Sequence, residues 1–297
     1  MKNEGILSVV IITCNRRDEL KKTIKSCLQY AGMKCEIIVV DNGSTDGTRE
    51  MLCDLTQEQD DYVIRPYYSD KNLGVAGGRN KGFELAQSDI VFFVDDDAVI
   101  KEESKPLCEA YNYLKNCNRI GALAFEIYDT KQMHNLVDVH AKTDEKCMIA
   151  YIGAAHMIKR CEIDGDLYPS RLMYGAEERY AAIKIMNKQK EIRYFGDIKI
   201  CHNPSTKTRM SQQEIHRNVK INQFVVKKLL YPEPWEFLAF LFFISRMCKL
   251  EKFNLYNVRK NIREAEKRYI ENKKAKTIVS NSCIKLIYKK FGLKSLL

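Results

Sequence analysis

Residues 90–100 read IVFFVDDDAVI, an apolar run that ends in three adjacent carboxylates. An unbroken run of this kind is typical of a strand that is buried on both faces, as in a parallel sheet. Two similar runs stand earlier in the chain, LSVVII at residues 7–12 and EIIVV at residues 36–40. Turn residues and helical spacing follow each of them. This alternation predicts an α/β fold with a doubly wound, mostly parallel sheet and helices on both faces.

The same pattern can be followed through the rest of the chain. We expect helices near residues 49–55 and from residue 74, and strands near residues 62–67, 119–127, 147–158 and 192–201. A polar insertion ends near residue 146, another helix begins near Glu177, and from Ser211 onward the spacing is helical. We therefore expect an α/β unit over residues 1–210 and a helical C-terminal region over residues 211–297.

The charge is distributed unevenly along the 297 residues. From Thr206 to the C-terminus there are 21 Lys and Arg against 7 Asp and Glu, which leaves 28 against 32 for residues 1–205. A net charge of +14 on the C-terminal part favours contact with an anionic partner such as a membrane surface. A solvated Lys-rich helical face is the alternative. Nucleic acid is not expected as a partner, because the basic residues form no recognisable RNA or DNA motif.

The cysteines and the lengths of the apolar runs indicate the cellular compartment of the protein. Eleven cysteines without a C-x-x-C pair are typical of free thiols in a reducing cytoplasm. The N-terminal apolar run is too short for a signal peptide. The run FLAFLFFIS at residues 237–245 is shorter than the roughly 20 residues that span a bilayer. We expect a cytoplasmic protein.

The acidic triplet is the first candidate site. Alternate residues of an extended segment point the same way, so Asp95 and Asp97 could reach one ion while Asp96 faces elsewhere. Carboxylate oxygens suit Mg²⁺ or Mn²⁺. A solvated acidic turn is the alternative reading.

Two more polar segments are expected at the same edge of the sheet. Asp41 ends the second strand, where its carboxylate could accept hydrogen bonds from a base or a ribose. The stretch KNLGVAGGRNKG at residues 71–82 places glycines at a helix start beside Lys71, Arg79 and Lys81. Such a helix start favours a diphosphate, although the stretch is neither a P-loop nor a dinucleotide fingerprint.

Four motifs in this order, LSVVIITCNR, EIIVVDNGSTDGT, KNLGVAGGRNKG and FFVDDDAVI, resemble the inverting family 2 glycosyltransferases of the GT-A fold. The third is especially similar to the bacterial rhamnosyltransferase-like branch. The resemblance continues, more weakly, to about residue 220 through MYGAEERYAAIKI and RYFGDIKICHNPS. It implies a nucleotide-binding half over residues 1–100 and an acceptor half over residues 101–210.

The resemblance also implies roles for individual residues. Glu178 would be the general base, with Glu177 beside it to orient the acceptor. A bound Mn²⁺ or Mg²⁺ would be held by Asp95, Asp97 and His202. The donor would be bound by Thr13, Asn15, Asp41, Lys71, Asn72, Gly77, Arg79, Asn80, Asp95 and Asp96.

This chain departs from the family pattern at the base. The family commonly has Glu-Asp where the chain has Glu177-Glu178, and Tyr180 occupies the following acidic position. These departures keep open a non-catalytic nucleotide-sugar-binding or scaffold subunit. A sugar nucleotidyltransferase is a further alternative, but a Gly-rich loop with Arg and Lys would then be expected directly after the first strand.

The resemblance and the basic C-terminal region together predict the substrates and the location of the protein. We expect a UDP- or dTDP-sugar as donor and a hydroxyl of a glycan or lipid-linked acceptor in surface polysaccharide biosynthesis. Residues 234–250 combine aromatic residues with flanking cations, as in helices that lie on a membrane. We therefore expect a peripheral protein on the inner face of the cell membrane. The alternative is that residues 234–250 pack on the catalytic domain.

Overall fold

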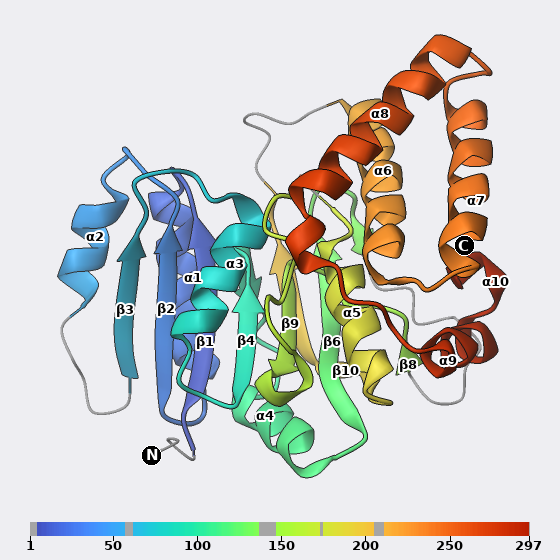
Figure 1. Ribbon diagram of the computed structural model, residues 1–297. Helices are drawn as coiled ribbons and strands as arrows, with labels where there is room; N and C mark the ends of the chain where they lie inside the picture. Colours follow the sequence, from blue (N-terminus) through green and yellow to red (C-terminus); the bar gives the residue numbers. More distant parts are fainter. Residues whose placement is uncertain (1–4, 57–61, 137–146, 173–174, 205–210, 297) are drawn as a thin grey trace.

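The structure is a computed structural model that describes residues 5–56, 62–136, 147–172, 175–204 and 211–296. Its described residues form one sheet of ten strands, in the order β3-β2-β1-β4-β9-β6-β10-β5, with β7 paired to β6 and β8 to β10 (Figure 1). The strands are β1 (Leu7–Thr13), β2 (Cys35–Asp41), β3 (Tyr62–Tyr68), β4 (Ile90–Val94), β5 (Ala98–Ile100), β6 (Ile120–Asp129), β7 (His134–Asn135), β8 (Cys147–Met148), β9 (Ala155–Lys159) and β10 (Glu191–His202).

Strands β1 to β4 are mutually parallel, as predicted, and their carboxyl ends share one edge. β9 runs antiparallel to both β4 and β6, whereas β10 is parallel to β6. Helices cover both faces. On one face, apolar side chains of the sheet form a cluster with α1 (Arg17–Tyr30), α2 (Thr48–Leu55) and α4 (Leu107–Asn116). On the other face they form a cluster with α3 (Gly74–Leu85) and α5 (Glu177–Asn187). The doubly wound α/β prediction is confirmed.

Two glycines of α3 allow that helix to pack closely on β1, whereas the sequence pattern indicated a diphosphate site. A Cβ at Gly78 would lie 2.9 Å from Cγ2 of Ile12, and one at Gly82 would lie 2.2 Å from Cγ1 of Val10. Ile12 and Val10 belong to β1, so these glycines let α3 lie directly on that strand. The glycine spacing thus reflects packing of a helix on a sheet, and not an approach to phosphate at these two positions.

Two parts of the second half differ from the prediction. The strand expected over residues 147–158 is two short strands, β8 and β9, with residues 149–154 between them outside any strand. The sequence pattern also did not indicate β5 or α4. Most of the polar insertion, residues 137–146, lies outside the described residues.

The C-terminal helices stand together beside α5 (Figure 1). They are α6 (Gln212–Leu230), α7 (Trp235–Leu250), α8 (Leu255–Glu271), α9 (Asn281–Phe291) and α10 (Leu293–Leu296), with short 3₁₀ turns at Arg160–Glu162 and Lys273–Ala275. Ser211 begins α6 with a capping box, because its hydroxyl accepts from the Glu214 amide while the Glu214 carboxylate accepts from the Ser211 amide.

The apolar face of the sheet beneath α3 and α5 continues into these helices as one cluster that reaches Leu296. The division at residue 210 stays a prediction, since residues 205–210 lie outside the described part. None of the described helices combines the length and apolar character that crossing a bilayer requires.

Candidate active site

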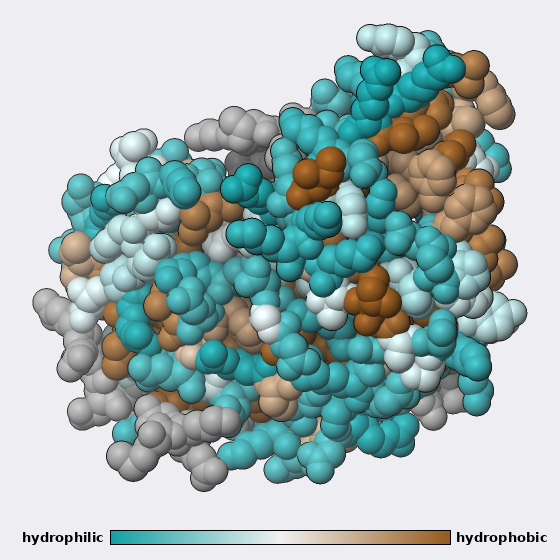
Figure 2. Space-filling view, in the orientation of Figure 1, coloured by the Kyte–Doolittle hydropathy of each residue, from teal (hydrophilic) through white to brown (hydrophobic). Residues whose placement is uncertain are grey.

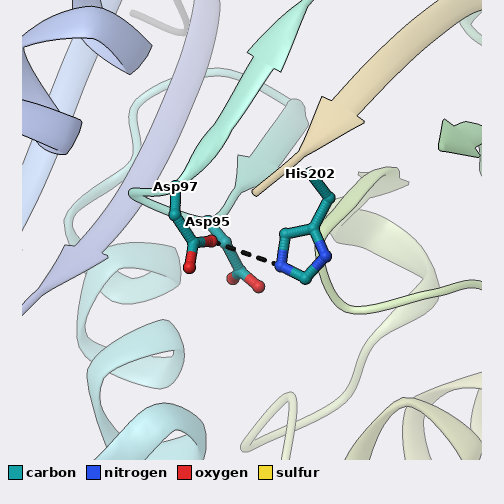
Figure 3. Close-up of side chains that lie close together, drawn as sticks. All are labelled: Asp95, Asp97 and His202. Atoms are coloured by element: carbon teal, nitrogen blue, oxygen red, sulfur yellow. Dashed lines mark ion pairs between the residues drawn. The ribbon is translucent and has the colours of Figure 1, made fainter. Parts of the chain in front are cut away.

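The acidic triplet forms the turn between β4 and β5. β5 pairs with β10 in a register that sets Ala98 opposite His202, which carries the histidine to the triplet. One ligand atom from each of Asp95, Asp97 and His202 lies within 4.8 Å of the others, and the side chains face a common space (Figure 3). Oδ1 of Asp97 and Nε2 of His202 lie 3.3 Å apart. The predicted side-by-side placement of Asp95 and Asp97 is therefore present.

The donor set of this trio fits a hard divalent ion. It offers two carboxylates and an imidazole, a combination that Mn²⁺ accepts and Mg²⁺ accepts less readily. Nδ1 of His202 lies 3.5 Å from Oδ2 of Asp129, within ion-pair distance of that carboxylate when the ring is protonated. Burial opposes the imidazolium, but the hydrogen bond and charge of Asp97 outweigh it and raise the pKa of His202.

Arg16 is a site residue that the sequence analysis missed. Its Nη1 lies 2.9 Å from Oδ1 of Asp96 and 2.5 Å from Oδ2 of Asp97. The left-handed conformation of Asn15, with φ of 55°, turns the chain after β1 so that Arg16 reaches the triplet. Burial raises the pKa of Asp96 to about 7 even though Arg16 lowers it. A basic residue directly after β1, at the same edge as the triplet, was the available signal.

Arg79 connects the triplet to the predicted base. Its guanidinium is buried, with Nη2 at 2.7 Å from Oδ1 of Asp95 and 2.9 Å from the carbonyl oxygen of Gly153. Its Nη1 lies 3.4 Å from Oε1 of Glu177 and 3.7 Å from Oε1 of Glu178. Arg79 lies in the middle of α3, which begins at Gly74 as expected. Its predicted contact with the donor stays a prediction.

Glu177 and Glu178 open α5, after a left-handed residue at Ala176 with φ of 74°. The Glu177 side chain is 7% exposed and that of Glu178 is 19% exposed, so Glu178 is the more accessible of the two. Burial, followed by the negative charge of Glu177, raises the pKa of Glu178 to about 8. A base whose pKa lies near the working pH suits proton transfer.

Two neighbours shape this pair. A Cβ at Gly153 would lie 2.2 Å from Oε1 of Glu178, so only glycine leaves room for the carboxylate. Tyr180 is buried and its hydroxyl donates to the carbonyl oxygen of Ala275 at 2.6 Å. Tyr180, which stands where the family pattern has an acidic residue, therefore links α5 to the C-terminal region through this hydrogen bond.

The predicted nucleotide end lies at the carboxyl ends of β1 and β2. Thr13 and Asp41 are register partners there, and both are buried. Asp41 accepts from the amide of Ser44 at 2.9 Å and from Nε of Arg49 at 3.3 Å. Both residues thus lie at the carboxyl edge of the sheet, where the ends of the first two strands were expected, while their role toward a base stays a prediction.

Other predicted donor residues have internal partners. Asn15 Oδ1 accepts from the amide of Thr45 at 2.7 Å, and Asn72 Oδ1 accepts from the amide of Gly74 at 2.8 Å. Asn80 donates to the carbonyl oxygen of Tyr168 at 2.8 Å and accepts from its amide at 2.9 Å. These side chains brace turns and loops around the site. Lys71 is exposed and Gly77 lies on α3.

Comparisons with known sequences identify the relatives of this chain. The model of the family described as glycosyl transferase family 2 matches residues 8–133. An uncharacterized protein of Haemophilus influenzae is 30% identical over 165 residues, which cover 53% of this chain and 89% of that protein. TuaG of Bacillus subtilis, a glycosyltransferase assigned to teichuronic acid biosynthesis, is 38% identical over 98 residues, covering 33% of this chain and 38% of TuaG.

The name of a third relative includes a lipid-linked acceptor. The GalNAc(5)-diNAcBac-PP-undecaprenol beta-1,3-glucosyltransferase of Campylobacter jejuni is 38% identical over 93 residues, covering 31% of this chain and 29% of that enzyme. The chain thus spans well under half the length of the two named enzymes.

Solved structures share the fold. S. aureus TarS 1–349 superposes with a TM-score of 0.61 at 17% identity, covering 94% of this chain and 82% of that one. The mannosyltransferase PcManGT from Pyrobaculum calidifontis, in complex with GDP-Man and Mn²⁺, gives 0.58 at 14% identity, covering 98% of this chain and 77% of that one.

The structural likeness confirms the expected GT-A type of architecture, and the rhamnosyltransferase-like branch stays a prediction. The family model covers the strands and turns that carry Thr13, Asp41 and the acidic triplet, and most of the Haemophilus influenzae relative aligns with this chain. The chain belongs to glycosyl transferase family 2.

Proposed function

We propose that the protein is an inverting, metal-dependent glycosyltransferase that moves a sugar from a UDP- or dTDP-sugar to a hydroxyl of a glycan or lipid-linked acceptor in surface polysaccharide biosynthesis. The observation that carries this proposal is the cluster of Asp95, Asp97 and His202 at the carboxyl edge of the sheet, joined through Arg79 to Glu178. A nucleotide-binding edge and a candidate base are thereby held in one network. The GDP-Man and Mn²⁺ of the mannosyltransferase PcManGT complex support a nucleotide sugar as the class of donor and a divalent ion beside it.

The residues divide the reaction between two ends of that network. Thr13 and Asp41 bind the nucleoside at the ends of β1 and β2. Asp95, Asp97 and His202 would hold the divalent ion, which neutralises the charge that grows on the leaving diphosphate. Glu178 takes the proton of the acceptor hydroxyl as that oxygen attacks the anomeric carbon, and the nucleoside diphosphate leaves from the opposite side. One displacement without a covalent intermediate inverts the configuration.

The first test is donor binding in the Asp97→Asn variant. We expect one nucleotide sugar of a UDP, dTDP, GDP and CMP panel to raise the melting temperature of the wild type only with Mn²⁺ present. Ligand at about 100 times its dissociation constant stabilises by about 2.7 kcal/mol. Asp97→Asn removes one anionic ligand of the ion and should abolish the shift. Differential scanning fluorimetry checks this.

Asp18→Asn is the matched control, because Asp18 is a carboxylate on the first turn of α1 that pairs with Arg17. It should keep the wild-type shift. An equal, Mn²⁺-dependent shift in Asp97→Asn would remove the metal assignment. A wild type that responds to no donor would favour the non-catalytic scaffold, and donor hydrolysis without acceptor separates that subunit from an enzyme.

The C-terminal helices support a peripheral membrane position. α7 buries Ala239, Phe243 and Met247, and the ring of Phe243 stacks on Phe224 of α6, so this face packs on a neighbouring C-terminal helix. Phe237, Leu238 and Leu241 are exposed on α7 by 54%, 38% and 48%. Hydrophobic residues are visible along the right-hand edge of the molecule, where α7 lies (Figure 2). An apolar helix face with Arg246 and Lys249 on the same helix suits an anionic lipid surface.

We therefore expect Phe237→Ser combined with Leu241→Ser to reduce binding to vesicles of phosphatidylglycerol and phosphatidylcholine. Each substitution removes apolar area that would enter the interface. Vesicle cosedimentation measures the bound fraction. Met133→Ser is the control, because Met133 is 71% exposed and follows β6, far along the chain from α7. Unchanged binding of the double variant would exclude α7 as the contact.

A further inference from the structure

A cleft of about 360 Å³ opens beside the predicted base. Its walls come from the first turn of α5, from α6 and α7, and from α10. Glu178 is the one carboxylate among the described residues that line it. Five other lining side chains are cationic, namely Arg179, Lys220, Lys227, Arg246 and Lys294. Asp95, Asp97 and His202 do not line this cleft, so it is separate from the candidate metal site.

Two cations of this cleft, called the basic cleft below, differ from other cations of the same helices, because Lys220 and Arg246 have no carboxylate partner among the described residues. On α6, Lys228 lies 2.6 Å from Glu266 and Arg217 lies 2.7 Å from Glu251. Among the described residues, no carboxylate lies within ion-pair distance of Lys220 or Arg246. Neutral partners serve Arg179, which donates to the carbonyl oxygens of Ile149 and Ser295.

The cations also repel one another. Burial, with the nearby charges of Arg179, Arg246 and Lys220, lowers the pKa of Lys227 to about 7. Burial and the charge of Arg246 lower the pKa of Lys220 as well. Gathering like charges in a partly buried cleft costs free energy, and a multivalent anion would offset that cost.

The position of the basic cleft matches one substrate of the proposed reaction. The donor diphosphate is assigned to the edge of the sheet at Asp95 and Asp97. Glu178 reaches Arg79 on that side and also lines the basic cleft. A molecule held in the basic cleft could therefore present a hydroxyl to Glu178 while its anionic group stays among the cations.

We propose that the basic cleft binds an acceptor that carries a phosphate or diphosphate group, and that this group sets the acceptor hydroxyl against Glu178. The inference rests on the proposed glycosyltransferase function and deepens it by naming the acceptor class. A neutral sugar would leave Lys220 and Arg246 without a counter-charge. The phosphate can come from a lipid-linked diphosphate or from a soluble phosphodiester chain, and both present the same chemistry to the cleft.

Inorganic pyrophosphate tests the basic cleft directly. Isothermal titration is run on the full chain in EDTA, so that a divalent ion does not carry the anion to the metal site. We expect binding that weakens as salt is raised, and a dissociation constant about tenfold or more higher in Lys220→Gln combined with Arg246→Gln. Lys228→Gln, on the same helix but paired with Glu266, should bind as the wild type does. No binding by the wild type, or equal binding by the double variant, overturns the proposal.

Acceptor assays separate the two sources. Transfer is measured to a short polyprenyl-diphosphate-linked sugar in detergent, to a glycerol-phosphate oligomer, and to a neutral methyl glycoside. The double variant should raise KM for the phosphate-bearing acceptor that the wild type uses, with a smaller effect on kcat. Preference of the wild type for the neutral glycoside overturns the inference. The Mn²⁺-dependent donor shift of the wild type reports on the proposed function independently, so the two failures are distinguishable.

Discussion

Replacing Glu178 with glutamine is expected to lower the rate of sugar transfer by about 10²- to 10⁴-fold while donor affinity stays near wild type. Glutamine keeps the shape and an oxygen near Arg79, but it cannot take a proton. Glu178 is the member of the pair that lines the basic cleft, whereas Glu177 is nearly buried. Steady-state kinetics with saturating donor give the rate, and the Mn²⁺-dependent melting shift gives donor binding.

The pH dependence distinguishes a base from a structural carboxylate. Burial, then the charge of Glu177, raises the pKa of Glu178 to about 8, so the basic form is the minor one at neutral pH. The wild-type rate should therefore increase as pH rises toward 8 and level off above it, while the residual rate of Glu178→Gln stays flat. Glu177→Gln is the matched control and should lose less activity. Full activity of Glu178→Gln, or a larger loss in Glu177→Gln, would move the base to Glu177.

The strand ends were predictable because they depend on local pattern and on one rule of sheet geometry. Runs of β-branched residues indicated buried parallel strands, and the carboxyl ends of such strands meet at one edge. That reasoning placed Thr13 and Asp41 at one edge of the sheet and predicted that Asp95 and Asp97 share a direction. His202 joined them through the resemblance, and the pairing of β5 with β10 gives the physical reason.

The charged network could not be read from the sequence, because its contacts join distant segments. Arg79 meets the carbonyl oxygen of Gly153 and the carboxylate of Glu177, which lie 74 and 98 residues away. Without those partners, the glycines around Arg79 indicated a phosphate site. The structure instead explains Gly78 and Gly82 by the close approach of α3 to β1.

The basic cleft was visible in the sequence only as a net charge. Its cations come from α5, α6, α7 and α10, and no local motif connects them. A charge count suggests an anionic partner but not where that partner sits. The position of that partner depends on the fold, which places some cations of α6 beside Glu178 and pairs others with Glu251 and Glu266.

Replacing Arg79 with methionine is expected to destabilise the fold by about 3–5 kcal/mol, the usual cost of removing one partner from a buried ion pair. Methionine fills much of the space, so the main effect is electrostatic. Asp95, Glu177 and Glu178 would lose the cation that they share. Asp95 is one-third exposed and can be solvated by water, so most of the cost comes from the two glutamates.

The loss of stability in Arg79→Met should depend on pH, and the raised pKa of Glu178 determines the direction of that dependence. The folded-state pKa of Glu178 is raised from 4.5 to about 8, so between these values the folded state binds a proton that the unfolded state has lost. Stability then falls as pH rises through this range, and more steeply without Arg79. Urea unfolding at pH 5 and pH 8 should show a larger loss for Arg79→Met at pH 8. Glu177→Gln added to Arg79→Met should restore part of it, and Arg17→Met, which breaks an exposed pair with Asp18, should change little. An equal loss at both pH values would mean that Arg79 acts through packing and its bond to Gly153, and not as the counter-charge of the glutamate pair.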